Sequence, residues 1–402
     1  MKSRYCWIAA FSIFCAPASA FTAVTVNCNG GAADYPSISA AVAALKTLPV
    51  SGNALIDVTG VCTENVVIEN FAVLTLNGHP GSAIVSPNSN SAIRIDDSNR
   101  VTVTSFAIRG GNPAVSVHRA TAVTFNSCNV GSPSAKGPGS GARFEQHAVA
   151  SLVNTSVDNF TGSAITALDG SIVTVQASVP VSLSNSAAGA SLFNLSSLTL
   201  TGKITVENNG GTGLVASSGS TLSIGGCNPG EMAIRGSQVG IASINSNLQV
   251  SCPVAIEGNH FYGVSQQFSG YMALFQAVVR NNGGGLSGPE APGGGVLLDG
   301  AAFYISQAQV LNNVGPGIRI LRGSRGLVFD SAVLFNSTDG IQASQGSVLE
   351  MSTVNNVTGH PGADLLCNTE ANVFGSKTGI GKLMCPGFSS ESGPKPFMPP
   401  IP

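Results

Sequence analysis

A repeating octet is the feature that most constrains how this chain folds. Each copy opens on a small residue, continues with an apolar, a variable and a second apolar or small residue, and often closes on Gly-Ser. A motif that recurs about every 20 to 50 residues is typical of solenoids and propellers, in which each unit buries its apolar side against its neighbours. The copies are spaced by about 25 residues on average and begin at Ala92, Ala114, Gly141, Ala164, Gly189, Gly213, Gly240, Gly263, Gly295, Gly317 and Gly340.

Each interval also contains two further short strand-like runs, such as residues 327–329 and 332–334. Three short strands per repeat are too few for a propeller blade, which has four. No helical period accompanies them, which excludes leucine-rich and helical solenoids. The pattern therefore predicts an all-β parallel β-helix with three short strands per coil and about a dozen coils.

Strand alternation points the second and fourth octet positions toward the core. The second positions should stack in one buried column that contains Ile93, Val115, Ile165, Leu214, Ile241, Val296, Ile318 and Ile341. An asparagine also recurs four residues before an octet, where we expect a ladder of stacked amides in left-handed turns. Its predicted members are Asn185, Asn209, Asn259, Asn313 and Asn336.

The two ends of the chain differ from the repeats. Residues 1–20 combine two basic residues, a short apolar run and an Ala-Ser-Ala cleavage pattern, which predicts a secretory signal peptide. Residues 21–50 are expected to cap the first coil with a short amphipathic helix. The β-helix is expected over 51–357, and 358–402 should form a disulfide-closed segment with a proline-rich tail that is extended or disordered.

Composition limits the compartment and the partners. No stretch approaches the ~20 apolar residues of a spanning helix, so we expect an exported protein, secreted, periplasmic or extracellular, without a transmembrane segment. Only 9% of the residues are charged and the formal net charge is −2, which leaves no basic excess for a phosphate backbone. Nucleic acid is therefore excluded as an expected partner.

Seven cysteines remain after the expected cleavage of the signal peptide. In an oxidising compartment, pairing of neighbours predicts three disulfides and leaves Cys128 inward and unreactive. No clustered Cys/His spacing occurs, so no structural metal site is expected. The predicted disulfides are Cys28–Cys62, Cys227–Cys252 and Cys367–Cys385.

The Asp-Tyr-Pro-Ser-Ile start at Asp34, the Asn-x-Gly-x-Gly-Ile turns and the three-strand coils resemble the pectin-lyase-like superfamily of right-handed parallel β-helices. The resemblance covers residues 22–357. It implies the right-handed fold and an association with carbohydrate, but it matches no specific enzyme family. The Asn-Thr-Asp, Gly-His-Gly and Arg-Ile-Lys motifs of polygalacturonase-like enzymes are missing, as is the Trp-Ile-Asp-His motif of pectate-lyase-like proteins.

Charged residues gather at the outward octet positions of three successive coils. Because coils stack ~4.8 Å apart, these side chains should form one surface, with residues 131–140 as a flexible wall beside it. His118 and Glu145 are the candidate catalytic residues for proton transfer, and Arg94, Asp96 and Arg143 are the candidates for binding a uronate carboxylate. No cofactor is required, although Asp96 and Glu145 could share a Ca²⁺ with that carboxylate. The alternative is a solvated face of ion pairs.

A second candidate site lies beside the longest insertion, residues 283–295. Three arginines within seven residues could hold an anionic sugar there, although arginine is common in turns. The residues are Asp299, Arg319, Arg322, Arg325 and Asp330.

Three functions remain open on the sequence. The first is a lyase or hydrolase that acts on an acidic polysaccharide, which the Arg/His/carboxylate patch favours. The second is a non-catalytic adhesin-like module that binds a cell-surface glycan, which the low charge and the missing motifs favour. The third is a trimerising spike, which would need an exposed apolar strip; Leu168, Phe193 and Ile244 occupy outward positions where such a strip would run.

Overall fold

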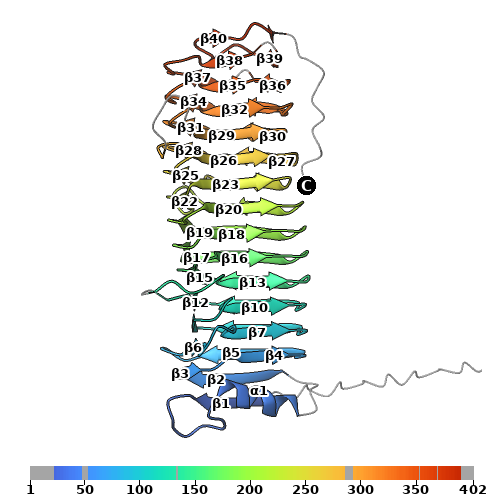
Figure 1. Ribbon diagram of the computed structural model, residues 1–402, viewed down its shortest axis with the longest axis vertical. Coiled ribbons are helices and arrows are strands. Elements are labelled where there is room, and N and C mark those ends of the chain that lie inside the picture. Colours follow the sequence, from blue (N-terminus) through green and yellow to red (C-terminus); the bar gives the residue numbers. More distant parts are fainter. Residues whose placement is uncertain are drawn as a thin grey trace, which may run out of the picture.

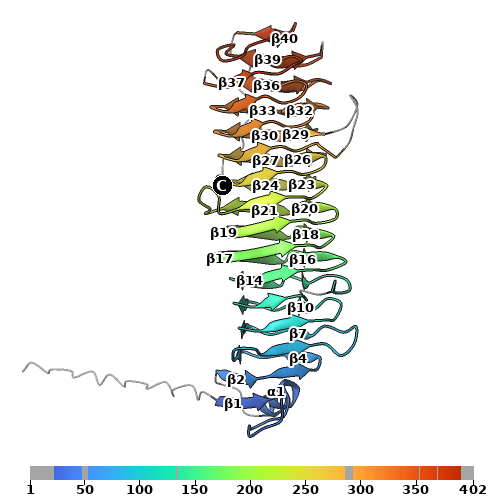
Figure 2. The same ribbon diagram turned by 90° about the vertical axis from the view of Figure 1, so that its left-hand side faces the viewer.

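The computed structural model describes residues 22–47, 53–132, 135–285, 293–352, 354–368 and 370–390. Within these ranges the chain winds into a right-handed parallel β-helix of about 13 turns, as the sequence predicts. The coils stack along one axis, and the one helix of the described residues lies beside the first of them (Figure 1; Figure 2). No helix in these ranges has the length and apolar character needed to cross a membrane. The predicted signal peptide and residues 391–402 of the tail lie outside the described residues.

The first face of the solenoid, called sheet 1 below, has 14 strands in the described part of the chain. Each strand pairs in parallel with the strand one coil above, so every octet occupies the same place on this face. Its strands are β4 (Val66–Glu69), β7 (Ile93–Asp96), β10 (Val115–His118), β13 (Ala142–Glu145), β16 (Ser163–Ala167), β18 (Ala188–Leu192), β20 (Thr212–Ser217), β23 (Val239–Ile244), β26 (Tyr262–Gln267), β29 (Gly294–Asp299), β32 (Ile318–Leu321), β35 (Ile341–Ala343), β38 (Leu365–Cys367) and β40 (Leu383–Met384).

The other two faces, sheets 2 and 3, are joined by the long strands β17 (Ile172–Ser184) and β19 (Ser197–Glu207). Sheet 2 also contains β1 (Thr22–Asn27), β2 (Ala54–Thr59), β5 (Val73–Gly78), β8 (Arg100–Thr104), β11 (Val123–Asn126), β14 (Val149–Val153), β21 (Thr221–Gly225), β24 (Asn247–Val250), β27 (Tyr271–Phe275), β30 (Ala302–Ser306), β33 (Arg325–Phe329), β36 (Val348–Met351), β39 (Asn372–Gly375) and β41 (Phe388–Ser389). Sheet 3 also contains β3 (Val61–Thr63), β6 (Ala83–Val85), β9 (Ala107–Arg109), β12 (Asn129–Val130), β15 (Ser156–Asp158), β22 (Ala233–Arg235), β25 (Ala255–Glu257), β28 (Val278–Arg280), β31 (Gln309–Leu311), β34 (Ala332–Leu334) and β37 (Asn356–Thr358).

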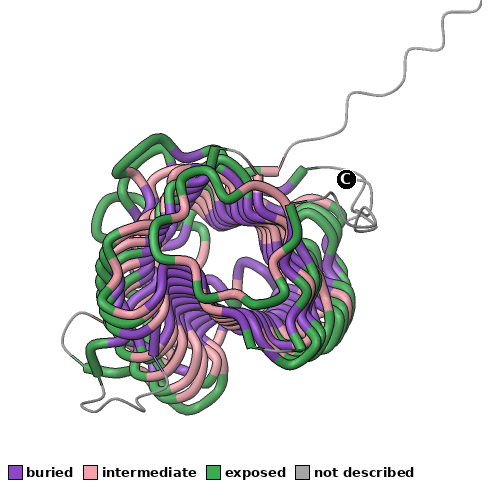
Figure 3. The backbone as a smooth tube through the Cα atoms, turned by 90° about the horizontal axis from the view of Figure 1, so that it is seen from above, coloured by how far each residue is buried: buried purple, intermediate pink, exposed green. Residues whose placement is uncertain are grey.

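One continuous core fills the centre of the coils, and the view down the axis shows the buried residues lining the inside (Figure 3). The eight residues predicted to form a column are all at most 1% exposed, and the register aligns them from Ile93 to Ile341. Aliphatic side chains on successive coils therefore pack directly on one another, which removes their surface from water.

The helix α1 (Ile38–Lys46) caps the first coil as predicted. Ser37 is its N-cap, and its hydroxyl accepts a hydrogen bond from the Ala40 backbone N–H. The buried side of the helix consists of the four residues expected from the sequence, Ile38, Ala41, Val42 and Leu45.

The coils extend further than the sequence suggests. Strands β38, β39, β40 and β41 continue the sheets beyond residue 357, and β1 pairs with β2 ahead of residue 51. The octet pattern does not predict the coil after residue 357, because its first position, one coil above Gly340, is occupied by Asp364 and not by a small residue. Leu365 nevertheless occupies the core column at 0% exposure.

The asparagine ladder forms at the corner that leads from sheet 3 to sheet 1. Asn282 and Asn313 each donate through Nδ2 to the Oδ1 of the asparagine one coil above, at 2.9–3.0 Å. Four of the five predicted members, Asn209, Asn259, Asn313 and Asn336, are buried. Asn185 is exposed. It has a positive φ, and the next residue, Ser186, occupies the buried ladder position, where its backbone N–H donates to Asn209 Oδ1.

Asn282 is a member that the sequence pattern misses, because residues 283–294 separate it from the octet that opens at Gly295. The glycine that opens an octet in the upper coils makes room for this ladder. A Cβ on Gly240 would lie 2.5 Å from the Gly263 carbonyl oxygen and 2.8 Å from Asn259 Nδ2.

All three predicted disulfides are present, Cys28–Cys62, Cys227–Cys252 and Cys367–Cys385. Three disulfides are typical of a protein that folds in an oxidising, extracytoplasmic compartment. Cys128 is the free cysteine of the described chain, and burial raises its pKa to about 11, which disfavours the reactive thiolate.

Candidate functional site

The outward residues of β4, β7, β10 and β13 form the floor of a groove of about 440 Å³ on sheet 1. Four of the five residues that the sequence assigns to the first candidate site line it: Arg94, His118, Arg143 and Glu145. They come together because the register sets Ser116 between Arg94 and Arg143, and His118 between Asp96 and Glu145. Strand alternation turns all of them away from the core.

The wall of the groove differs from the one predicted. Asn90, Ser91, Asn112 and Pro113 line it, all from loops at the corner between sheets 3 and 1. None of the described residues among 131–140 lines the groove. Gly139 instead lies against the side chain of Asn112, so this end of the insertion packs against a residue of the wall.

Glu145 holds two neighbouring side chains in place. Its Oε1 lies 3.0 Å from His118 Nε2, and its Oε2 lies 2.9 Å from Arg143 Nε and 2.7 Å from Arg143 Nη2. The carboxylate therefore lies between the imidazole and the guanidinium and fixes both side chains on the floor of the groove.

The surroundings of His118 Nε2 suit one of the two neutral tautomers. Nε2 lies 3.0 Å from Glu145 Oε1 and 2.5 Å from the Ser116 hydroxyl. A carboxylate can only accept a hydrogen bond, so the tautomer with its proton on Nε2 is the one that complements Glu145. In the neutral imidazole the lone pair is then on Nδ1, which has no hydrogen-bond partner in the described part of the chain. A neutral histidine oriented in this way can act as a general base.

Asp96 lies beneath this surface instead of in it. Its side chain is 6% exposed, Oδ2 lies 2.7 Å from Arg94 Nε, and Oδ1 is buried without a partner. His118 lies between Asp96 and Glu145 in the register, so the two carboxylates are two coils apart. Each arginine also has part of its guanidinium engaged with an internal carboxylate, which leaves the remaining N–H groups for a ligand.

A neighbouring cluster at the turn after these strands is structural. Arg119 bonds both oxygens of Asp97 at 2.7 and 2.8 Å and the Gln146 side chain at 2.6 Å, which ties three coils together. The hydrogen bonds from the Arg119 guanidinium lower the pKa of Asp97.

The second candidate site is only partly assembled. Arg322 pairs with both carboxylate oxygens of Asp299 and lies over the Phe268 ring at 5.4 Å. Arg319 is on the outward side of β32 nearby, whereas Arg325 opens β33 on sheet 2 and Asp330 follows that strand. The five residues do not form one site, because the chain turns a corner between Arg322 and Arg325.

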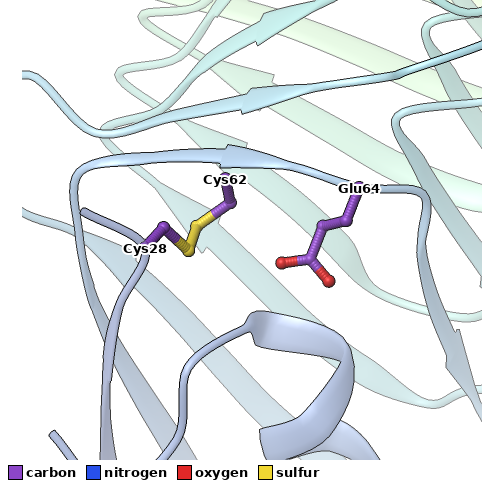
Figure 4. A group of neighbouring side chains, drawn as sticks. All are labelled: Cys28, Cys62 and Glu64. Carbon is purple, nitrogen blue, oxygen red and sulfur yellow. A yellow bond between two sulfur atoms is a disulfide. The ribbon is translucent and has the colours of Figure 1, made fainter. Parts of the chain in front are cut away.

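The side chains of Cys28, Cys62 and Glu64 lie close enough together to hold a metal ion, but each has a structural role instead (Figure 4). The two sulfurs form a disulfide, and the Glu64 carboxylate accepts hydrogen bonds from the backbone N–H groups of Ile38 and Ser39 at 2.9 Å. A carboxylate at a helix N-terminus satisfies otherwise unpaired donors and the helix dipole. This cluster therefore fastens α1 to the second coil.

The outward apolar residues do not form a continuous strip. Ile244 is 38% exposed, but Leu168 and Phe193 are half-buried. Sequence reasoning missed the groove residues Asn65, Asn90, Asn112 and Pro113; the Asn-Pro dipeptide and the asparagine-rich run at 88–90 are turn signals that mark these loops.

No protein-family model matches the chain, and no curated protein matches it significantly. Among solved structures, a double mutant of the periplasmic alginate epimerase AlgG aligns with a TM-score of 0.37 at 12% identity, over 80% of this chain and 76% of that one. Pectin methylesterase from carrot aligns with a TM-score of 0.27 at 11% identity, over 92% and 88%. The A-module of the Azotobacter vinelandii mannuronan C-5 epimerase AlgE4 gives 0.33 at 12%, over 92% and 100%. Similarity at this level concerns the coiled architecture and carries no information on the chemistry of the groove.

Proposed function

We propose that this protein is an exported lyase that acts on an anionic, uronate-containing polysaccharide in the groove of sheet 1. The observation that carries the proposal is His118, which is held through Nε2 by Glu145 and has an unpartnered Nδ1. The outward arginines of the strands on either side, Arg94 and Arg143, flank its strand. A base between two cations fits the removal of a proton next to a carboxylate.

The chemistry follows from these positions. Arg94 and Arg143 bind the uronate carboxylate through their remaining N–H groups and stabilise the negative charge that develops there. His118 Nδ1 takes the proton from the carbon next to that carboxylate. The electron pair forms a carbon–carbon double bond, and the bond to the glycosidic oxygen breaks. The proton then passes to the departing oxygen, which returns His118 to its neutral form.

Hydrolysis fits the groove less well. Glycoside hydrolysis ordinarily needs two carboxyl groups that face the scissile bond, one of them able to donate a proton. Here Asp96 is buried against Arg94, and both oxygens of Glu145 are occupied by His118 and Arg143. The free lone pair on His118 therefore favours elimination.

The test is a panel of uronate polymers monitored for the absorbance of the unsaturated uronate product, alongside a glycan array. His118→Ala should abolish product formation while binding is retained, because the base does not anchor the substrate. Arg143→Ala should weaken uronate binding by about 1–3 kcal/mol, the usual cost of a lost charge-assisted hydrogen bond.

His79→Ala is the matched control, because His79 is an exposed histidine at a turn outside the groove. Elimination that persists in His118→Ala would overturn the mechanism. Binding without any product would support the second candidate function, a non-catalytic glycan-binding module, which the engagement of both acidic side chains also favours. Neither binding nor product on any anionic glycan would overturn both.

A further inference from the structure

The outward position occupied by Arg94 and Arg143 continues as one straight column across sheet 1. The register pairs Arg94 with Ser116 and Ser116 with Arg143, and the same column then passes up the solenoid to Arg319 and Gln342. Between Arg143 and Arg319 it contains six uncharged side chains: Thr166, Ser191, Val215, Ala242, Ser265 and Leu297. None of the six carries a charge or a ring; Ser191 and Ser265 are buried and the other four are half-buried.

Arg319 is the unusual member of the column. Its Nε is buried and has no hydrogen-bond partner, and the guanidinium makes no ion pair with any residue that the structure describes. Gln342, directly above it, also has a side-chain amide without a partner in the described chain. Arg319 as a whole is half-buried, so an anionic ligand on this face could reach its guanidinium and supply the counterion that the protein does not.

The nearby Arg322, in contrast, has a counterion. It follows directly after β32, and both carboxylate oxygens of Asp299 pair with its guanidinium. Asp299 is therefore unavailable to Arg319, and Leu297, the residue below Arg319 in the register, has no acceptor side chain. The positive charge of Arg319 has no counterion within the described protein.

We propose that Arg319 and Gln342 form a remote subsite for the same anionic polysaccharide chain that enters the groove, which then lies along this column. The proposal rests on the function proposed for the groove. Charge complementarity selects the occupant, because the column carries arginines at both ends and no acidic side chain between them. Arg143 and Arg319 are seven register steps apart, which corresponds to roughly 34 Å at the usual strand spacing.

Such a subsite makes binding depend on chain length. Oligomers confined to the groove meet only Arg94 and Arg143, whereas a chain that exceeds ~34 Å along the column also reaches Arg319. The second contact is intramolecular once the first is made, so long chains gain affinity without any change in the groove.

The experiment measures the dissociation constants of uronate oligomers of graded length, from trisaccharides to chains longer than the column, on the full chain. In the wild type, affinity should rise steeply once the oligomer spans the column. Arg319→Ala should weaken long-chain binding roughly tenfold and leave trisaccharide binding unchanged. Arg325→Ala is the matched control, because it removes the same charge from sheet 2.

A second pair of variants tests the path between the two ends. Ala242→Glu places a negative charge midway along the column and should weaken long chains only, whereas Ala242→Lys should not. If short and long oligomers bind equally to the wild type and to Arg319→Ala, the remote subsite is refuted while the groove stands. If no oligomer of any length binds, the function proposed for the groove fails instead.

Discussion

The corner between sheets 3 and 1 is built in two ways along the same solenoid. In the upper coils, Asn259, Asn282, Asn313 and Asn336 bond one another through buried side chains, and the corner is closed. In the lower coils the corner after β9 turns through Gly110 and Gly111, both with positive φ, and Asn112 and Pro113 of that loop form part of the wall of the groove.

This difference shows that the same corner of the repeat can either stabilise the stack of coils or present free polar groups to a ligand. The ladder amides use their hydrogen-bonding capacity on neighbouring coils, so they stabilise the stack but have nothing left for a ligand. The side-chain amides of Asn90 and Asn112 have no partner in the described chain and line the groove. The groove therefore exists where the ladder is absent, on coils whose cores are otherwise the same.

The largest expected effect tests whether the cores are indeed the same. Ile241→Asp in the upper coils and Val115→Asp in the lower coils each place an unpaired charge at a position at most 1% exposed. Both should lower the free energy of unfolding by about 4 kcal/mol or more and abolish secretion of folded protein. Thermal melting and yield measure this. A normal melting curve for either variant would contradict a continuous core column.

The second effect should be specific to the ladder. Asn313→Ala removes the acceptor of the Asn282 backbone N–H, one of the two acceptors of Asn282 Nδ2, and the donor to the Val279 carbonyl. We therefore expect a loss of about 3 kcal/mol in the free energy of unfolding. Denaturant titration gives the value. Asn312→Gly is the control, because Asn312 is exposed and has a φ of 55°, which glycine adopts readily. This variant should be as stable as the wild type. Equal stability of Asn313→Ala and wild type would show that the ladder does not contribute to the free energy of unfolding.

The third effect concerns the top of the ladder, where Asn336 Nδ2 donates to His360 Nε2 and His360 Nδ1 lies 2.6 Å from Asp364. Burial opposes ionisation of Asp364, but hydrogen bonds from the Lys382 N–H and from His360 outweigh it and lower the pKa of Asp364 below its ordinary 3.8. A lowered carboxylate pKa stabilises the fold above the unfolded-state value and loses this effect as the pH falls through the folded-state value.

Asp364→Asn should therefore reduce the free energy of unfolding by about 2 kcal/mol at neutral pH, because charge-assisted hydrogen bonds are lost. The difference from the wild type should begin to shrink below pH ~3.8, where Asp364 of the unfolded chain takes up a proton, and should disappear once the pH has fallen through the lower folded-state pKa. Chemical denaturation of both proteins across this acidic range measures it. A difference that stays constant with pH would contradict an ionised Asp364 in the fold.

The smallest effect on stability is expected at the open corner. Asn112→Ala removes an amide without a protein partner, so the free energy of unfolding should change by less than ~0.5 kcal/mol. Uronate binding should nevertheless weaken by about 1 kcal/mol if Asn112 contacts the ligand. Calorimetric titration alongside melting separates the two. A large loss of stability with intact binding would make this corner a structural element like the ladder.

The sequence alone determined the fold of this protein, the core column, the capping helix and the three disulfides. These features are periodic or local: alternation in a strand and a fixed octet spacing leave few ways to bury the apolar positions. The same alternation correctly brought together Arg94, His118, Arg143 and Glu145, because stacking on successive coils follows from the repeat.

Only the tertiary structure decided how those residues relate to one another. The burial of Asp96, the attachment of Glu145 to both His118 and Arg143, and the wall formed by Asn112 and Pro113 depend on side-chain rotamers and on loops outside the repeat. Loop paths are set by contacts between distant segments, such as Gly139 against Asn112, and no periodic pattern encodes them. The sequence thus locates the chemistry on the solenoid, and the packing of the loops decides which atoms are free to perform it.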